Sequence, residues 1–380
     1  MTNPLFQPYV FANGLTLRNR VVMAPMTTWS ANPDETISDE ELAFYRARAR
    51  GAGLILTGCS HVQPSGVGFN REFAAYDDRF IPSLRRLAEA AKSGGGLAIL
   101  QLFHAGNKAV PDLIPNRDLV SASAMAAPKG PFNDGQLASR ALTEPEILAV
   151  IRDFGEATRR AIEAGFDGVE LHGAHGFLLQ NFLSPLFNQR TDEWGGSLAN
   201  RMRFPLAVIQ EVRRVITQHA THPFLLGYRL SPEEPEAGGL RIEESLRLAE
   251  KLAAEGHLDY LHASLYTILA GKAQDGDEDR PLAARLAEQL AGRLPLMAAG
   301  EIRTPEEAHQ ALAMGLSMVA IGRGLVLNPN WVELTQAGRE AELTQALDLS
   351  APAGQLHIPA PLKAVIQSMP GWFPVRTEEE

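Results

Sequence analysis

The segment Glu144-Pro-Glu-Ile-Leu-Ala-Val-Ile-Arg-Asp-Phe-Gly-Glu-Ala-Thr-Arg-Arg-Ala-Ile-Glu-Ala-Gly165 runs directly into Phe166-Asp-Gly-Val-Glu-Leu171 and then His172-Gly-Ala-His175. The first part has helical period, with Thr143 as the cap, Pro145 in the first turn and a terminal glycine, so it predicts an amphipathic helix. The short branched apolar run after it predicts a buried strand. The two histidines, three residues apart, can point at one small target if the chain turns helical there.

The same alternation of helix and strand extends along most of the chain. Eight apolar runs predict strands at residues 20–25, 54–60, 97–104, 168–172, 224–230, 260–264, 295–299 and 318–321. Periodicity alone does not show whether such a sheet closes, so an open doubly wound sheet also fits. About eight strand–helix units favour the closed form, and we predict an α/β fold of the (β/α)8 TIM-barrel type.

Two additions to the barrel are expected. Asn13-Gly14 lies between two short apolar runs and predicts a two-residue β-hairpin loop in which both residues have positive φ. This N-terminal hairpin is expected to cover one end of the barrel. Long loops at about 106–140 and 177–203 follow the third and fourth strands, on the side where barrel enzymes keep their active sites. We expect one domain over residues 1–376 and a disordered tail at 377–380.

Composition narrows the class of protein. The 380 residues carry a net charge of −10 and one cysteine, Cys59. An acidic chain without a basic cluster predicts neither nucleic-acid nor membrane binding, and one cysteine excludes an internal disulfide or a cysteine-ligated iron–sulfur cluster. Neither a signal peptide nor a membrane span is evident, so we expect a cytoplasmic protein. Within its apolar strand Cys59 is expected to be a packed, inert thiol.

Polar residues and glycines mark the strand ends. Glycines and an arginine after the last two strands, Gly300, Gly322 and Arg323, match the usual phosphate site of a barrel, although they could simply close tight turns. Arg229, inside a strand, needs an anionic partner, either Glu170 or a cofactor that becomes negatively charged on reduction. Gln101 offers a donor and an acceptor suited to the edge of an amide-like ring.

The histidine pair has three interpretations. His172 and His175 could bind a metal with a third ligand such as His104, could be structural, or could bind an oxygen of a substrate or cofactor. The third is favoured, and we expect no metal.

Five motifs are spread along the chain: Asn19-Arg-Val-Val-Met-Ala-Pro-Met26, Gln101-Leu-Phe-His-Ala-Gly106, His172-Gly-Ala-His175, Asn188-Gln-Arg-Thr-Asp-Glu-Trp-Gly-Gly-Ser-Leu-Ala-Asn-Arg201 and Ile321-Gly-Arg323. Together they resemble the Old Yellow Enzyme family of FMN-dependent oxidoreductases. The resemblance covers nearly the whole chain. It implies one barrel that holds FMN at its C-terminal mouth, NAD(P)H as electron donor, and a small-molecule acceptor. We also expect a homo-oligomer.

The resemblance assigns expected roles to individual residues. The implied flavin contacts are Ala24, Pro25, Met26 and Cys59 along the ring, Thr27 at its O4 edge, Gln101 at the pyrimidine, Arg229 near N1, and Gly300, Gly322 and Arg323 at the phosphate. His172 and His175 would bind an oxygen of the stacked substrate, and Trp29 would shape its pocket. The implied reaction passes hydride to an alkene activated by a carbonyl or nitro group, or to a quinone-type acceptor.

One residue departs from the family pattern. Many ene-reductases of the family have a proton-donating tyrosine where this chain has Phe177. Phenylalanine cannot donate a proton, and losing a general acid typically costs about 100-fold or more where that transfer matters. Either water or another residue, such as Tyr266, supplies the proton, or the natural acceptor needs none.

Two other functions fit the sequence pattern. One is a related flavin dehydrogenase that oxidises an amine or a saturated carbonyl compound. The other is a flavin-free barrel that binds a phosphorylated metabolite.

Overall fold

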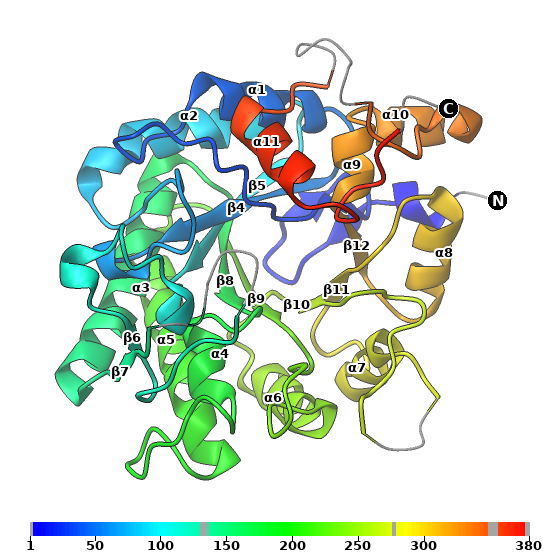
Figure 1. Cartoon of the computed structure of the whole chain (residues 1–380). Helices are drawn as coiled ribbons and strands as arrows, with labels where there is room; N and C mark the ends of the chain where they lie inside the picture. Colours follow the sequence, from blue (N-terminus) through cyan, green and yellow to red (C-terminus); the bar gives the residue numbers. More distant parts are fainter. Residues whose placement is uncertain (1–2, 130–134, 136, 276–278, 349–355, 377–380) are drawn as a thin grey trace.

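Eight parallel strands close into a barrel, in the order in which they occur along the chain (Figure 1). The computed structural model describes residues 3–129, 135, 137–275, 279–348 and 356–376; the predicted tail at 377–380 lies outside them. The barrel strands are β3 (Val21–Met23), β4 (Leu54–His61), β5 (Leu97–Phe103), β8 (Gly168–Gly173), β9 (Leu225–Leu230), β10 (Tyr260–Ser264), β11 (Leu296–Ala299) and β12 (Met318–Ile321). The predicted (β/α)8 TIM barrel is therefore confirmed.

Helices surround the barrel and bury their apolar faces against it. They are α1 (Asp39–Arg48), α2 (Ile81–Lys92), α3 (Glu144–Ala164), α5 (Leu198–His219), α6 (Ile242–Glu255), α7 (Leu282–Leu290), α8 (Pro305–Ala313), α9 (Arg323–Leu327) and α10 (Trp331–Gln336). Helix α11 (Ala360–Ser368) follows near the C-terminus. Within the described part of the chain, no helix has the length and apolar character needed to cross a bilayer.

Helix α3 begins and ends where its sequence predicts. Thr143 and Glu146 form a capping box, in which the Thr143 backbone N–H donates to Glu146 Oε2 at 2.7 Å. Gly165 ends the helix with a φ of 87°, a conformation that costs glycine little. The predicted strand at 20–25 is longer than β3, which ends at Met23, because Pro25 has no N–H for the ladder.

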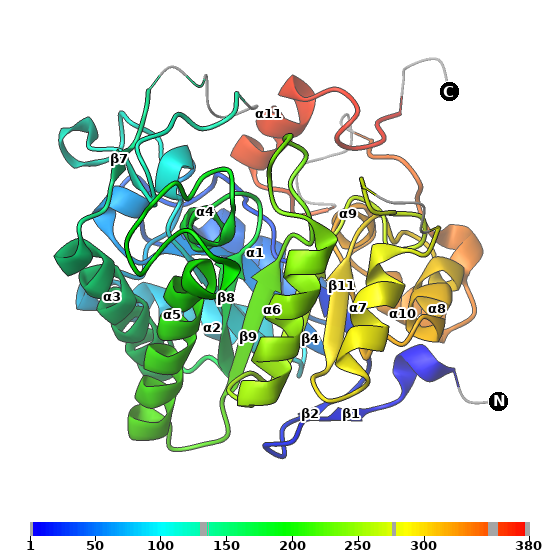
Figure 2. The same ribbon diagram turned by 90° about the horizontal axis from the view of Figure 1, so that it is seen from below.

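The N-terminal hairpin pairs β1 (Tyr9–Val10) with β2 (Thr16–Leu17). The predicted two-residue loop, with a positive φ at both Asn13 and Gly14, is wrong, because only Gly14 has a positive φ. The loop has three residues, with the Gly14 N–H donating to Phe11 O and the Phe11 N–H to Leu15 O. Phe11 and Leu17 pack in one cluster with barrel residues, so the hairpin closes the N-terminal end of the barrel (Figure 2).

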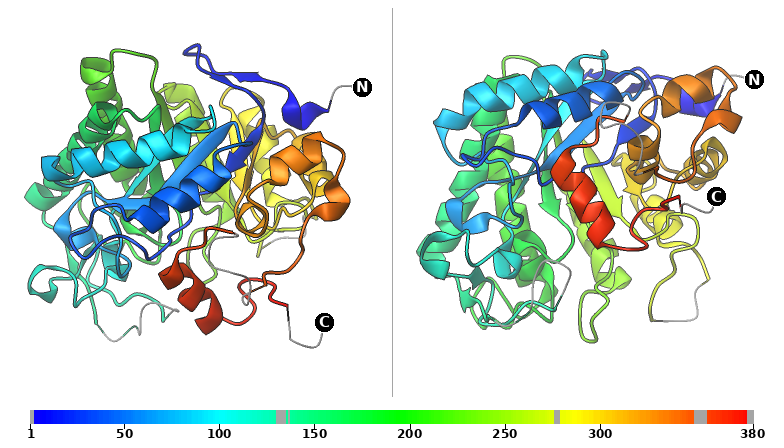
Figure 3. Two further views of the ribbon diagram at one scale, coloured as in Figure 1. Left: turned by 90° about the horizontal axis from the view of Figure 1, so that it is seen from above. Right: turned by 45° about the horizontal axis from the view of Figure 1, so that its top comes forward.

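The loops after β5 and β8 contain more regular structure than predicted. The first includes β6 (Val120–Ser121) and β7 (Arg140–Ala141), which pair in parallel. The second contains the short helix α4 (Leu178–Leu183), and it ends at Ser197, which caps α5 through the Asn200 N–H. Helix α11 and the segment after it lie at the end of the barrel opposite the hairpin (Figures 2 and 3).

Candidate active site at the C-terminal mouth of the barrel

One cavity of about 630 Å³ opens where the barrel strands end. That volume is within the usual range for a site that binds a small molecule or a cofactor. All the residues that the sequence singled out for the site line it, namely Ala24, Pro25, Met26, Thr27, Trp29, Cys59, Gln101, His172, His175, Phe177, Arg229, Tyr266, Gly300, Gly322 and Arg323.

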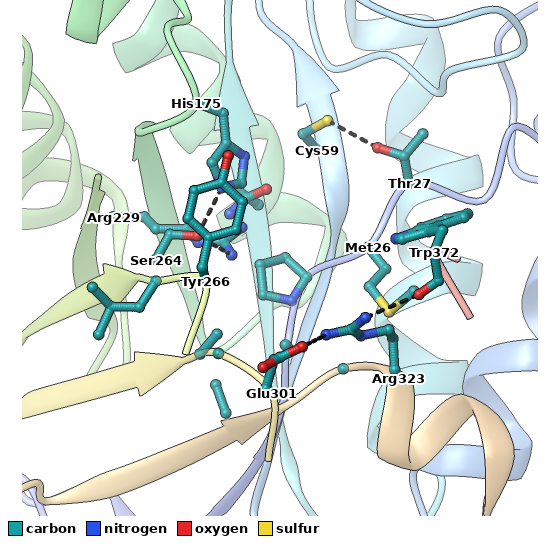
Figure 4. A pocket seen from close by; sticks show the side chains of 18 of the residues that line it. Met26, Thr27, Cys59, His175, Arg229, Ser264, Tyr266, Glu301, Arg323 and Trp372 are labelled. Atoms are coloured by element: carbon teal, nitrogen blue, oxygen red, sulfur yellow. Dashed lines mark hydrogen bonds and ion pairs between the residues drawn. The ribbon is translucent and has the colours of Figure 1, made fainter. Parts of the chain in front are cut away.

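A β-bulge brings one wall of the cavity together. The register between β4 and β5 shifts between Leu56 and Cys59. At Gly58 a β-carbon would lie 2.7 Å from the Met26 carbonyl oxygen, so only glycine lets β4 approach that backbone. As a result Thr27 Oγ1 lies 3.6 Å from Cys59 Sγ (Figure 4). Burial raises the pKa of the Cys59 thiol well above its usual value, which agrees with an inert thiol.

Below the cavity a carboxylate organises the barrel interior. Glu170 is fully buried and accepts hydrogen bonds from Gln101 Nε2 at 2.7 Å and from His262 Nδ1 at 2.9 Å. Burial alone would raise the pKa of Glu170, but His262, Arg229 and Gln101 outweigh it and lower that pKa. Glu170 is therefore an anion at the centre of the fold.

Arg229 is nine-tenths buried and lines the cavity. Its direct partner is Ser264 Oγ, 2.9 Å from Nη2, whereas Glu170 bonds to other groups; a direct Arg229–Glu170 pair is therefore not how this arginine is held. Its Nε atom is buried and has no hydrogen-bond partner among the described residues. A buried guanidinium with an unused donor fits an acceptor or an anion supplied by a ligand.

The two histidines lie together on one wall, with ring centroids 4.9 Å apart. Burial, with the charges of Arg229 and other nearby cations, lowers the pKa of His172 well below its usual value. Desolvation, with the charges of Arg229 and Lys108, does the same to the pKa of His175, which is exposed to the cavity. Both rings are therefore neutral, and each carries one N–H donor.

His104 lies elsewhere. It does not line the cavity; its Nδ1 accepts the Gly106 N–H at 3.0 Å, and its Nε2 lies 3.3 Å from Ser65 Oγ. Burial and the charge of His61 lower the pKa of His104 to about 3. It is a structural residue and not a third metal ligand. Among the described residues no group of three His, Cys, Asp or Glu side chains is placed to hold a metal ion.

The opposite side of the cavity carries the glycines and the arginine after β11 and β12. A β-carbon at Gly300 would lie 2.8 Å from the Leu265 carbonyl oxygen, so this glycine lets two backbones meet. Arg323 donates Nη1 to the Trp372 carbonyl oxygen at 2.9 Å, and its Nη2 lies 3.3 Å from Glu301 (Figure 4). The arginine is thus at the cavity wall beside the two glycines.

Several lining residues had no signal in the sequence. They are Phe69, Ser264, Leu265, Glu301, Ile302, Arg303, Ala320, Met369, Gly371 and Trp372. The ring of Trp372 stands edge-on to Trp29, with 6.0 Å between the ring centroids, and forms part of the wall. Phe373, next to it, is the packing residue, at 3 % exposed.

A buried ion cluster holds the loop that carries Phe69. His61 is fully buried, with Nδ1 2.8 Å from Glu72 Oε1 and Nε2 3.1 Å from Glu35 Oε1. The other Glu72 oxygen accepts the backbone N–H groups of Gly68 and Phe69, each at 3.1 Å. Burial opposes protonation of His61, but the two glutamates outweigh it and raise its pKa to about 9.

This cluster predicts a stability change at alkaline pH. The folded protein keeps a proton on His61 up to about pH 9, whereas the unfolded chain releases it near the ordinary value of 6.5. The contribution of His61 is therefore complete below about pH 6.5 and is lost as pH rises through about 9. Urea unfolding between pH 6.5 and 9.5 should show a falling free energy of unfolding in the wild type and a flatter profile in His61→Gln. Parallel profiles for the two proteins would contradict this.

Comparisons with known proteins agree with this geometry. Residues 4–342 match the sequence profile of the NADH:flavin oxidoreductase / NADH oxidase family. A probable NADH-dependent flavin oxidoreductase, YqiG of Bacillus subtilis, is 41 % identical over 373 residues, which is 98 % of each chain. The NADH:fumarate oxidoreductase of Klebsiella pneumoniae is 42 % identical over 94 % of this chain, which spans only 38 % of that longer protein. The Old Yellow Enzyme homologue of Zymomonas mobilis has a TM-score of 0.79 and 26 % identity, and the match covers 93 % of this chain and 99 % of that one.

Fold, cavity and relatives define an NAD(P)H-dependent flavin oxidoreductase whose cofactor is FMN. The chain belongs to the NADH:flavin oxidoreductase / NADH oxidase family, which confirms the resemblance to the Old Yellow Enzymes. This assignment favours a flavin enzyme over the flavin-free barrel that the sequence pattern also allowed.

Proposed function

We propose that this enzyme uses NAD(P)H to reduce an acceptor that carries a polarisable oxygen: an alkene conjugated to a carbonyl or nitro group, or a quinone. The observation that carries the proposal is the pair of neutral imidazoles, His172 and His175, on one wall of the cavity. Two N–H donors aimed at one oxygen stabilise the negative charge that develops there as the acceptor is reduced, as an oxyanion hole does.

The cavity also fits the cofactor. The buried, unused Nε of Arg229 supports the proposal that this arginine faces the pyrimidine side of the flavin, together with Gln101. Because Gln101 donates its Nε2 to Glu170, its carbonyl oxygen is free to accept a hydrogen bond from the ring. Gly300, Gly322 and Arg323 would hold the phosphate, and Ala24, Pro25, Met26, Thr27 and Cys59 would line the ring. When bound, FMN supplies hydride transfer in two stages, from the nicotinamide and then to the acceptor.

An anaerobic stopped-flow experiment tests the proposed function. The flavin is first reduced with one equivalent of NADH or NADPH and then mixed with cyclic enones, nitroalkenes or quinones. Rapid return of the oxidised flavin spectrum with at least one of these classes is expected. Reduction of the flavin by amines or saturated ketones, with no reoxidation by the panel, would favour the dehydrogenase alternative instead.

The proposed phosphate site predicts a selective effect of Gly322→Ala. The new β-carbon would lie 3.4 Å from Met26 Sδ and 3.7 Å from Ala24 Cβ, which are ordinary contacts, so the protein without FMN should keep its melting temperature. The methyl group would stand where the phosphate approaches the backbone, and losing one charged hydrogen bond weakens binding by about tenfold or more. Fluorescence titration with FMN measures this, and unchanged FMN affinity would remove Gly322 from the proposed site.

Phe177, which stands where many ene-reductases of the family have a tyrosine, predicts that Phe177→Tyr changes flavin reoxidation differently for different acceptors. Phe177 is packed edge-on against His172, with ring centroids 4.9 Å apart, so Phe177→Tyr would place a hydroxyl beside the histidines. The α carbon of a reduced alkene needs a positioned proton donor, whereas the oxygens of a reduced quinone take their proton directly from water. Reoxidation by an enone should therefore accelerate by about tenfold or more, while reoxidation by a quinone stays unchanged. Equal changes with both acceptors would contradict this role of position 177.

A further inference from the structure

A chain of hydrogen bonds connects Arg229 to His175 through one hydroxyl. Arg229 Nη2 donates to Ser264 Oγ at 2.9 Å, and the same oxygen lies 2.7 Å from His175 Nε2 (Figure 4). The residues come from different parts of the barrel: Arg229 from β9, Ser264 from the end of β10 and His175 from the turn after β8.

The number of hydrogen atoms on each group determines which atom donates in these two hydrogen bonds. A guanidinium only donates, so Ser264 must accept from Arg229 and still has one hydrogen to donate. His175 Nε2 is the partner that can accept it. If His175 Nε2 carried the proton instead, both it and Arg229 would point an N–H group at Ser264 Oγ. The hydroxyl hydrogen of Ser264 would then have no acceptor among the described residues.

The backbone of His175 is held as firmly as its ring. The residue has a φ of +60°, which is unfavourable for a non-glycine residue and persists only where neighbours impose it. The His175 N–H donates to Ser231 Oγ at 3.0 Å, and Lys108 Nζ donates to the His175 carbonyl oxygen at 2.6 Å. The imidazole is thus fixed in position, and only the placement of its proton remains to be set.

In the other histidine, His172, the proton is on the opposite ring nitrogen. His172 Nδ1 accepts the Ala174 backbone N–H at 3.3 Å, so the proton of this ring is on Nε2. If Ser264 donates to His175 Nε2, the proton of the second ring is on Nδ1. Neither His172 Nε2 nor His175 Nδ1 has a hydrogen-bond partner among the described residues, and both side chains line the cavity.

We propose that Ser264 is a positioning residue that holds His175 in the Nδ1–H tautomer, so that both histidines offer an N–H group to the oxygen of the acceptor. The use of this pair by an acceptor rests on the proposed function, but the tautomer is a property of the protein alone. Without Ser264, His175 is free to carry its proton on Nε2, and its Nδ1 would then present a lone pair to the acceptor oxygen, which repels it.

Nitrogen-15 NMR of the FMN-loaded protein, labelled at histidine, tests the tautomer directly. The His175 signals are assigned by their loss in His175→Gln. In the wild type, Nε2 of His175 should show the shift of an unprotonated ring nitrogen and Nδ1 that of a protonated one. Ser264→Ala should move the ring toward the Nε2–H tautomer, and Ser264→Thr, which keeps the hydroxyl, should restore the wild-type pattern. Ser231→Ala is the matched control, because it removes a hydroxyl from the His175 backbone and not from the ring.

Kinetics give the functional part of the test. In Ser264→Ala, kcat/KM for the acceptor should fall by roughly tenfold and recover in Ser264→Thr. A wild-type spectrum with the proton on Nε2, or an unchanged His175 spectrum in Ser264→Ala, overturns the proposal whatever the acceptor is. If the His175 spectrum is as expected but the enzyme reduces none of the enones, nitroalkenes or quinones, the proposed function is refuted and the role of Ser264 stands.

Discussion

Replacing either histidine of the pair by alanine, His172→Ala or His175→Ala, is expected to lower kcat/KM for the acceptor by about 100- to 1000-fold. Each substitution removes one preorganised N–H donor from the place where negative charge develops, and losses of this size are typical of oxyanion-hole donors. Steady-state kinetics with an enone or a quinone measure the effect. It should appear in both single variants because the two donors share one oxygen.

The matched control is His222→Ala. His222 is exposed and precedes β9, far from the mouth, so its removal should leave the kinetics unchanged. FMN content and melting temperature of all variants must stay near the wild-type values for the comparison to hold. A loss below tenfold in both His172→Ala and His175→Ala would mean that the acceptor binds elsewhere.

The second large effect concerns stability. Glu170→Ala should lower the free energy of unfolding by about 3–5 kcal/mol, because it removes the carboxylate that accepts hydrogen bonds from His262 and Gln101 and leaves the charge of Arg229 uncompensated in the interior. Urea unfolding followed by circular dichroism measures this loss. It should be largest in the protein without FMN, where no ligand can compensate.

Two further variants make that result specific. Glu170→Gln keeps the shape and loses the charge, so it should be destabilised less than Glu170→Ala. Glu250→Gln breaks the exposed pair with Arg293 and should leave the unfolding midpoint unchanged, as is usual for surface ion pairs. Equal midpoints for wild type and Glu170→Ala would show that the buried anion is not required.

The fold could be predicted because its signals are local. Each barrel strand contains a short apolar stretch, and helices such as α3 carry their own cap, proline and terminal glycine. The turn at Asn13-Gly14 could not be read in the same way, because both the two-residue and the three-residue loop place glycine where φ is positive. The pairing of β6 with β7 was missed because strands of two residues have no periodicity.

The site could be predicted where strand ends bring residues together. His172, Arg229 and Gln101 lie at the ends of strands or within them, and parallel strands carry such residues to one mouth. Ser264 was missed because one serine at a strand end has many ordinary explanations, and only its contact with Arg229 and His175 shows its place. Trp372 was missed because it belongs to a segment after the last barrel strand, and no local sequence pattern predicts that this segment packs over the cavity.

The hairpin plug at the far end of the barrel has a kinetic consequence. Phe11 and Leu17 pack against barrel residues at that end, so the interior of the barrel is filled there, and the described cavity opens at the C-terminal mouth. Under the proposed function we therefore expect nicotinamide and oxidant to bind in turn at this one mouth, each leaving before the other enters. Double-reciprocal plots of rate against acceptor concentration at several fixed NAD(P)H concentrations should therefore be parallel. An excess of either substrate should inhibit turnover by competing with the other for the site.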